Sequence, residues 1–230
     1  APDAMLILGD TNSCLVCIAA KKKKIPIFHM EAGNRCFDQR VPEEVNRRII
    51  DHTSDLNLTY TEHARRYLIA EGLPADRTIK TGSPMFEVLA YVASKVAACN
   101  VVSEMGLKPL EYFVASVHRE ENVDTEENLR LLVESLNRVV QRFSKPVIFS
   151  VHPRTRARLN ALVGLHIDES IRTLEPLGFV EYVALQKQAA CVLSDSGTIT
   201  EEASILGFPA VTLRTAHERP EGMDAGVLIM

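Results

Sequence analysis

The chain has 230 residues, 46% of them hydrophobic and 24% charged, so it can bury a core large enough for one or two globular domains. Its net charge of −4 excludes a global basic field for nucleic acid or an anionic membrane, and no apolar run reaches the ~20 residues of a membrane-spanning helix. The five cysteines suggest no secreted disulfide framework and no leader precedes the first strand, so we expect a cytoplasmic protein without nucleic-acid or membrane partners.

Short apolar runs alternate with longer segments of helical periodicity along the whole chain. Several runs are near-continuous, as expected for strands covered on both faces. One apolar stripe at helical spacing extends from Leu129 to Phe143. Repeated strand–helix–strand units predict parallel, doubly wound α/β sheets that bind ligands beyond the carboxyl ends of their strands. The predicted strands are 4–9, 25–30, 55–60, 112–117, 146–151, 191–195 and 209–214, with a last one in "VLIM" at 227–230.

A long helical pattern at 84–106 separates two series of strands. We therefore predict two Rossmann-like domains, residues 1–95 and residues 96–230, with a ligand in the cleft between them. The chain opens almost directly in one strand and stops in another, so we expect residues to be missing at both ends.

Two patterns near the first predicted helix have ordinary explanations. Cys14 and Cys17 form one C-x-x-C motif without a second pair, so we expect no metal site. The four lysines at 21–24 follow a helical pattern, where positive charge faces the negative pole of the backbone dipole. We interpret them as a solvated helix end rather than as a polyanion-binding patch.

Carboxylates follow the first two predicted strands. Asp10 in "LGDTNS" comes after the first strand and Glu31 in "HMEAGNR" after the second, so both are expected in one crevice. Paired carboxylates have separated pKa values, as proton abstraction and delivery require. Asp10 could instead be the N-cap of the helix that follows it.

The helix start in "VPEEVNRRI" carries two glutamates, Glu43 and Glu44. Acidic residues complement the positive end of the helix dipole, which accounts for one of them. The same short stretch is dense in further charged and amide side chains, so a functional loop is favoured as much as a solvated one. These side chains are Arg35, Asp38, Arg40, Asn46 and Arg47.

Two predicted strands of the second half end in Val-His, which places His118 and His152 at parallel strand ends. Either histidine alone could be a structural group, whereas the pair favours a position in the cleft. The sequence contains neither the G-x-G-x-x-G fingerprint nor the G-x-x-x-x-G-K-[ST] loop. Nicotinamide cofactors and ATP hydrolysis are therefore disfavoured.

The segment "LSDSGTITEEA" predicts a strand, a tight turn at 196–198 and a helix. The N–H groups of that turn and the positive pole of the helix could bind a diphosphate. Glu202 offers two acceptor oxygens for the hydroxyls of a ribose, although helix capping alone would explain Ser196 and Glu201. Arg219 in "HERPEG" adds a cation that suits a phosphate.

Eight motifs in this order resemble the non-hydrolysing UDP-N-acetylglucosamine 2-epimerase family, in particular the branch that acts on modified UDP-2-acetamido sugars. They are "GDTNS", "HMEAGNR", "PEEVNRR", "TGSP", "HREEN", "VHPRTR", "SDSGTITEEA" and "ERPEG". Two departures from the family pattern stand out. The loop between Glu31 and Glu43 is shorter than in enzymes for the plain sugar, and Thr198 replaces the second glycine of the usual "SGG".

The resemblance implies a GT-B-like fold, a homodimer, no cofactor and a UDP-sugar substrate of bacterial surface polysaccharide synthesis. It implies inversion at C2 through elimination of UDP, a bound 2-acetamidoglycal and re-addition of UDP. Asp10, Glu31 and Glu43 resemble the catalytic carboxylates and His152 the essential histidine. The residues implied in substrate binding are His118, Arg119, Ser196, Gly197, Thr198, Glu202 and Arg219. A GT-B glycosyltransferase and a non-catalytic nucleotide-sugar sensor are the alternatives.

Overall fold

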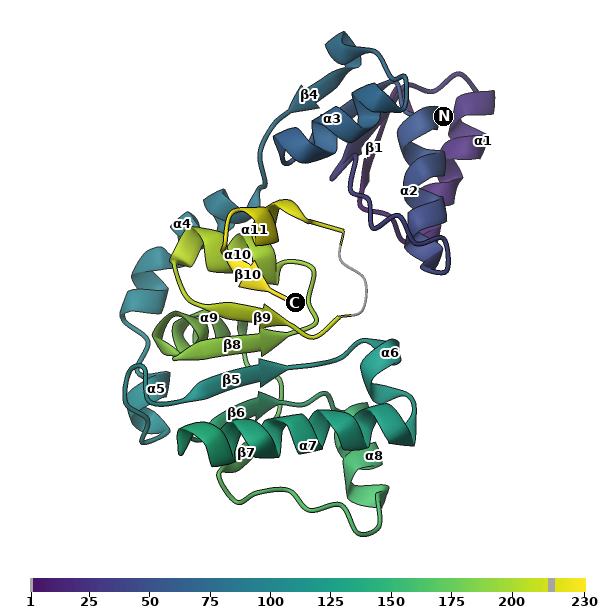
Figure 1. Ribbon diagram of the computed structural model, residues 1–230. Coiled ribbons are helices and arrows are strands. Elements are labelled where there is room, and N and C mark those ends of the chain that lie inside the picture. Colours follow the sequence, from purple (N-terminus) through teal and green to yellow (C-terminus); the bar gives the residue numbers. More distant parts are fainter. Residues whose placement is uncertain (1, 215–217) are drawn as a thin grey trace. The chain divides into compact units, whose positions relative to one another are not determined.

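The computed structural model describes residues 2–214 and 218–230, which form two compact units (Figure 1). Unit 1 contains the described residues 2–84 and 218–221, and unit 2 contains 85–214 and 222–230. The boundary therefore lies before helix α4 (Met85–Ala97), not at residue 95 near its end. The reason is that Leu89, Val92 and Val96 of α4 belong to the hydrophobic core of unit 2.

Unit 1 is built on a sheet of four parallel strands in the order β1-β2-β3-β4. Successive strands lie side by side, so the chain winds in one direction only within the described part of this unit. The elements are β1 (Met5–Leu8), η1 (Asn12–Leu15), α1 (Val16–Lys22), β2 (Ile27–Met30), α2 (Pro42–Thr53), β3 (Leu56–Thr59), α3 (Glu62–Ala70), η2 (Ala75–Arg77) and β4 (Thr78–Lys80).

Helices cover one face of this sheet and leave apolar side chains exposed on the other. Ile7 and Ile27 pack against Cys14, Cys17 and Ile50 from η1, α1 and α2. The alternate strand residues face the other way, and Leu6 of β1 and Phe28 of β2 are 65% and 36% exposed. The prediction that the apolar runs are covered on both faces is therefore wrong for β1 and β2 in the described structure.

Unit 2 carries a sheet of six parallel strands in the order β10-β9-β8-β5-β6-β7 (Figure 1). The winding reverses between β5 and β8, so this sheet is doubly wound as predicted, and the reversal is the usual ligand position of such folds. The further elements are α5 (Val101–Glu104), β5 (Phe113–Ser116), α6 (Glu120–Val123), α7 (Glu126–Phe143), β6 (Val147–Ser150), α8 (Pro153–Ala161), β7 (Ile171–Leu174), α9 (Phe179–Gln188), β8 (Cys191–Ser194), α10 (Ile199–Leu206), β9 (Ala210–Thr212), α11 (Glu221–Asp224) and β10 (Leu228–Ile229).

The central strands of unit 2 are buried on both faces, as their continuous apolar runs predict. Val114 and Ile148 join the core that includes α4, α9 and α10, while Phe113 and Phe149 join the core under α7. The predicted stripe of α7 contributes Leu129, Leu132, Val133, Leu136 and Val140 to that second core. Phe143, at the end of the stripe, is 54% exposed, and its ring lies tilted against that of Phe113 with the centroids 5.2 Å apart.

All predicted strands are present, and two further ones, β4 and β7, were not predicted. Both lie at sheet edges and bury only one residue each, so their sequences lack a buried-strand pattern. The helical pattern at 84–106 forms two helices, α4 and α5, because the backbone leaves the helix at 98–100.

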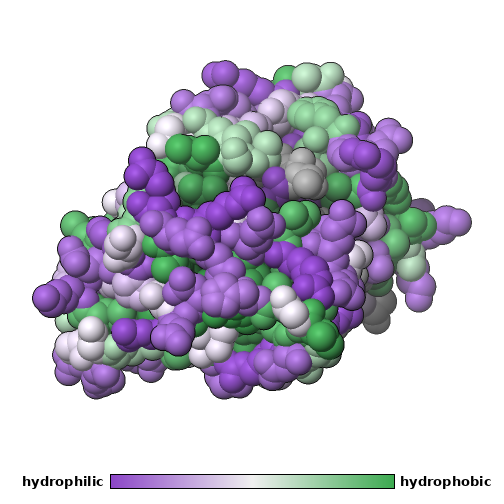
Figure 2. Space-filling model, turned by 60° about the horizontal axis from the view of Figure 1, so that its bottom comes forward, coloured by the Kyte–Doolittle hydropathy of each residue, from purple (hydrophilic) through white to green (hydrophobic). Residues whose placement is uncertain are grey.

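Within 2–214 and 218–230, no helix combines the length and the apolar character needed to cross a bilayer. The same residues contain no cluster of histidine, cysteine or acidic side chains suited to a metal ion. Figure 2 shows hydrophilic residues over most of the face in view, with apolar residues scattered among them.

Candidate functional site

The carboxyl ends of β1 and β2 bring Asp10 and Glu31 to neighbouring positions in unit 1. The strands pair with Leu8 opposite Met30, and Gly9 N donates to Met30 O at 3.2 Å. A Cβ atom placed on Gly9 would lie 3.5 Å from Glu31 Oε2, so the carboxylate of Glu31 rests against the residue before Asp10. Glu31 itself has a φ of +69°, a strained conformation that non-glycine residues adopt mainly where surrounding contacts impose it.

Two residues of helix α2 hold Asp10 in place. Its Oδ2 accepts a hydrogen bond of 2.6 Å from Arg47 Nε, and its carbonyl accepts one of 2.9 Å from Asn46 Nδ2. The N-cap of η1 is Thr11, whose side chain makes no capping bond. The alternative explanation of Asp10 as an N-cap is therefore wrong, because its carboxylate is engaged by a guanidinium.

A second guanidinium engages Glu31. Arg219 donates from one terminal nitrogen to Glu31 Oε1, and Asn34 Nδ2 lies 3.4 Å from the same oxygen. The side chain of Arg219 is 7% exposed and that of Glu31 is 24% exposed. Arg219 thus belongs to unit 1 and faces a carboxylate, whereas the sequence placed it in the nucleotide-binding domain.

The two glutamates at the start of α2 have different environments. Glu44 is fully buried and accepts from Cys36 N at 3.0 Å and from Arg47 at 3.2 Å. Glu43 is half-buried and forms no hydrogen bond or ion pair with any residue that the structure describes. Glu44 therefore fixes the preceding loop, and Glu43 keeps its carboxylate available for another partner.

The loop after Glu31 is anchored by a buried arginine that sequence reasoning did not single out as a site residue. Arg35 is inaccessible to solvent and donates to Asp51 Oδ2 at 2.7 Å and, through two nitrogens, to both oxygens of Glu71 at 2.8 Å. These hydrogen bonds from Arg35 lower the pKa of Glu71 to about 2, against the opposing effect of burial.

Glu71→Gln is expected to lower the free energy of unfolding by about 2 kcal/mol at neutral pH, because Arg35 loses a charged partner that it cannot replace with water. A carboxylate with a lowered folded-state pKa stabilises the chain above its ordinary value of 4.5, and this stabilisation is lost as the pH falls towards 2. Thermal unfolding across this range should show a difference between the two proteins that shrinks with acidity. A constant difference down to the acid limit would contradict the assignment.

In unit 2, a buried aspartate organises the reversal point of the sheet. Asp195 follows β8, is inaccessible to solvent, and accepts from the backbone N–H groups of His118 at 3.0 Å and Arg119 at 2.9 Å. Asn122 Nδ2 donates to the same carboxylate at 2.9 Å. Burial raises the pKa of Asp195, but hydrogen bonds from His118 and Asn122 outweigh it, and the pKa is lowered overall.

The two predicted histidines follow adjacent strands. Ser116 of β5 pairs with Ser150 of β6, so His118 and His152 come at equal distances beyond paired residues. His118 Nδ1 lies 3.0 Å from Asp195 Oδ1, so one ring nitrogen is held while the side chain stays 56% exposed. His152 is exposed in front of α8.

The turn at 196–198 is closed by its own side chains. Ser196 Oγ lies 3.0 Å from Thr198 Oγ1, and Thr198 Oγ1 donates to Glu202 Oε1 at 2.7 Å. Gln186 Nε2, from α9, donates to Glu202 Oε2 at 2.8 Å. Glu202 is 7% exposed, and each oxygen retains a second acceptor position for a ligand hydroxyl.

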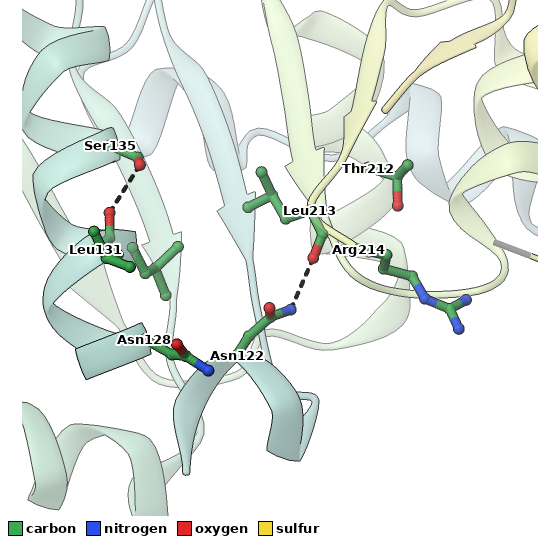
Figure 3. A pocket seen from close by; sticks show the side chains of 8 residues that line it. Asn122, Asn128, Leu131, Ser135, Thr212, Leu213 and Arg214 are labelled. Atoms are coloured by element: carbon green, nitrogen blue, oxygen red, sulfur yellow. Dashed lines mark hydrogen bonds between the residues drawn. The ribbon is translucent and has the colours of Figure 1, made fainter. Parts of the chain in front are cut away.

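A hollow of about 380 Å³ lies between α7 and the end of β9, next to Asn122 (Figure 3). Asn122 at its edge donates to Leu213 O at 2.8 Å and also holds Asp195. None of the predicted site residues lines it. The lining residues are Asn122, Asn128, Leu131, Leu132, Ser135, Thr212, Leu213 and Arg214.

The residues that sequence reasoning missed are those that hold the predicted site side chains in place. Asp195 stands inside the motif "SDSG", next to the predicted Ser196, and Arg47 lies in the charged stretch after Glu43. The signal for both was a charged residue at the end of a buried strand or on a buried helix face. Gln186 carried no such signal, because it lies in a helix pattern without a motif.

Comparisons with known proteins agree with the fold and the motifs. The model of the family described as UDP-N-acetylglucosamine 2-epimerase matches residues 1–230. A UDP-N-acetylglucosamine 2-epimerase of Methanocaldococcus jannaschii is 36% identical over 100% of this chain and 64% of its own length. A UDP-2,3-diacetamido-2,3-dideoxy-D-glucuronate 2-epimerase of Pseudomonas aeruginosa is 35% identical over 100% of this chain and 63% of its own.

Solved structures show the same likeness. A UDP-N-acetylglucosamine 2-epimerase from Rickettsia bellii has a TM-score of 0.90 and 57% identity, and the match covers 100% of this chain and 61% of that one. The Methanocaldococcus jannaschii enzyme in complex with UDP-GlcNAc and UDP has a TM-score of 0.88 and 37% identity, covering 99% and 64%. The chain thus spans less than two thirds of the length of these relatives.

Proposed function

Because the chain belongs to the UDP-N-acetylglucosamine 2-epimerase family, we propose that it inverts C2 of a UDP-2-acetamido sugar. The reaction proceeds by removal of the C2 proton and departure of UDP from C1, which leaves a 2-acetamidoglycal. Protonation of C2 from the opposite face and re-addition of UDP then give the epimer. Such a reaction requires two acid–base groups and a site that stabilises the departing diphosphate.

Unit 1 supplies the acid–base groups in this proposal. The observation that carries it is the placement of Asp10 and Glu31 at adjacent strand ends, each held by one guanidinium. Burial lowers the pKa of Arg47, but the charges of Asp10 and Glu218 and the hydrogen bond to Asp10 together outweigh it, so the pKa is raised and this guanidinium stays charged beside Asp10. Glu43, whose carboxylate forms no hydrogen bond or ion pair with the described residues, is the third proposed catalytic group.

Unit 2 holds the nucleotide in this proposal. The reversal of its sheet, the turn at 196–198 and the start of α10 form one edge of the unit, where backbone N–H groups suit a diphosphate. Glu202, oriented by Thr198 and Gln186, accepts the ribose hydroxyls. Gly197, Arg119 and Arg219 remain proposed contacts of the substrate.

We assign His118 to the substrate site together with His152. The contact of His118 Nδ1 with Asp195 at 3.0 Å fixes the ring while its side chain stays exposed, which suits a histidine that binds a ligand. His152 stays in the proposal as the catalytic histidine that the family resemblance implies. The homodimer, the cytoplasmic location, the absence of a cofactor and the role in bacterial surface polysaccharide synthesis are further parts of the proposal and rest on the family resemblance.

The test is incubation of the chain with a panel of UDP-2-acetamido sugars in deuterated water. Deuterium at C2, detected by NMR and mass spectrometry, is the expected result, and the sugar that exchanges fastest identifies the substrate branch. UDP binding is measured separately by calorimetry. Binding of UDP without exchange would contradict epimerisation and support a glycosyltransferase, if an added acceptor receives the sugar, or a nucleotide-sugar sensor if none does.

A further inference from the structure

A buried histidine that the proposed reaction does not use lies beside the loops that carry Asp10 and Glu31. His29 is on β2, two residues before Glu31, and its side chain is 1% exposed. Its Nδ1 lies 2.8 Å from Asp51 Oδ1, on α2, and its Nε2 lies 3.2 Å from the carbonyl oxygen of Gly9. The ring therefore bridges the residue before Asp10 and a buried carboxylate.

The same carboxylate holds the loop that follows Glu31. Gly33 N donates to the two oxygens of Asp51 at 3.4 and 3.3 Å, and Arg35 donates to Asp51 Oδ2 at 2.7 Å. Gly33 has a φ of +83°, and a Cβ atom there would lie 2.4 Å from the carbonyl oxygen of Ala64, so the loop is packed tightly on α3. Asp51 thus connects the loop after β2 with the histidine that supports the loop after β1.

Both contacts of the His29 ring are with acceptors. A backbone carbonyl carries no proton, and both oxygens of Asp51 already accept from Gly33 N or Arg35, so this carboxylate is bonded as an acceptor. Each ring nitrogen must then donate for both contacts to be hydrogen bonds. A ring with one proton would turn a lone pair towards Gly9 O or towards Asp51, and a buried acceptor would lose its donor.

We propose that His29 carries two protons and acts as a positioning residue, which ties the Gly9–Asp10 loop and the Glu31–Gly33 loop to the single buried charge of Asp51. The distance between the carboxylates of Asp10 and Glu31 is then set by one rigid bridge of charged hydrogen bonds. The charges of this arrangement are balanced, because the positive charges of His29 and Arg35 offset the negative charges of Asp51 and Glu71. The inference rests on the proposed function in assigning acid–base roles to Asp10 and Glu31.

The first test is ¹⁵N NMR of the histidine rings in the unmodified chain at about pH 8, above the ordinary histidine pKa of ~6.5. The His29 signals are identified by their loss in His29→Gln. We expect two protonated ring nitrogens for His29 and one for the exposed His166, which serves as the internal control. A single protonated nitrogen at His29 overturns the proposal, and this readout needs no epimerase activity.

The second test separates positioning from general stabilisation. In His29→Gln, kcat for deuterium exchange at C2 is expected to fall about 100-fold with KM within a few-fold, because misplacement of a catalytic group by about 1 Å has an effect of this size. The control His166→Gln should leave both constants unchanged. An unchanged kcat in His29→Gln, or an equal loss in kcat and substrate affinity, overturns the proposal. Absence of exchange in the unmodified chain would contradict the proposed function instead, and the NMR result would then decide the protonation of His29 alone.

Discussion

Asp195→Asn is expected to lower the free energy of unfolding of unit 2 by about 3 kcal/mol, because the substitution places an NH₂ group against donors in a site without water. The carboxylate receives the backbone N–H groups of His118 and Arg119 and the side chain of Asn122. An asparagine can accept at one atom only. Urea unfolding followed by circular dichroism measures the loss.

The pH dependence of this loss follows from the sign of the pKa shift. The pKa of Asp195 is lowered in the folded chain, so its stabilising effect is complete above the ordinary value of 3.8 and disappears as the pH falls below it. The difference between the two proteins should therefore be largest at neutral pH. The matched control is Asp76→Asn, which removes an exposed carboxylate and should change stability by less than about 0.5 kcal/mol. Equal effects of the two substitutions would contradict the role of Asp195.

Asp195→Asn also tests the link between stability and the site. The substitution releases Nδ1 of His118, so the ring loses its fixed orientation while remaining exposed. Weaker UDP binding in a variant that still folds at low temperature would show that the orientation of His118 matters for the nucleotide.

Strands that are buried on both faces could be predicted from sequence, and edge strands could not. β5 and β6 consist of apolar residues because helices cover both sides, and the sequence displays that directly. β4 and β7 alternate or expose their side chains at the edges of their sheets, so they resemble loops. The apolar runs of β1 and β2 looked the same as those of β5, yet one of their faces is open in the described structure. Apolar character shows that a face suits burial and does not identify what covers it.

For the site, the positions of the residues could be predicted from sequence, whereas their bonding partners could not. Asp10 and Glu31 were expected at strand ends of the first sheet, and His118 and Ser196 at strand ends of the second. They lie there because the parallel strands of each sheet direct their carboxyl ends to one edge of that sheet. Their partners are distant in sequence. Arg47 reaches Asp10 across 37 positions, Asp195 reaches His118 across 77, and Arg219 reaches Glu31 across 188. A motif fixes the residue types at one strand end, whereas these pairings depend on how separate elements pack.

Glu31→Gln is expected to reduce deuterium exchange at C2 by about 1,000-fold, within the range that a general acid–base group contributes. The amide has nearly the same shape and can still accept a hydrogen bond from Arg219, but it cannot take up a proton from carbon. UDP affinity should stay within a few-fold, because the proposed nucleotide contacts other than Arg219 lie in unit 2 and the amide leaves Arg219 an acceptor. Single-turnover exchange measured by NMR, together with UDP titration, gives both quantities.

Two comparisons make this result specific to the carboxylate. Glu62→Gln, on α3, removes a partly exposed charge whose ion pairs are with Arg65 and Arg66, and it should leave exchange unchanged. Asp10→Asn should match Glu31→Gln, because Arg47 engages Asp10 as Arg219 engages Glu31. Full turnover in Glu31→Gln would remove Glu31 from the mechanism. Loss of exchange in Glu31→Gln with Asp10→Asn unaffected would assign the proton transfer to Glu31 and its other neighbours, with Asp10 limited to holding Arg47 in place.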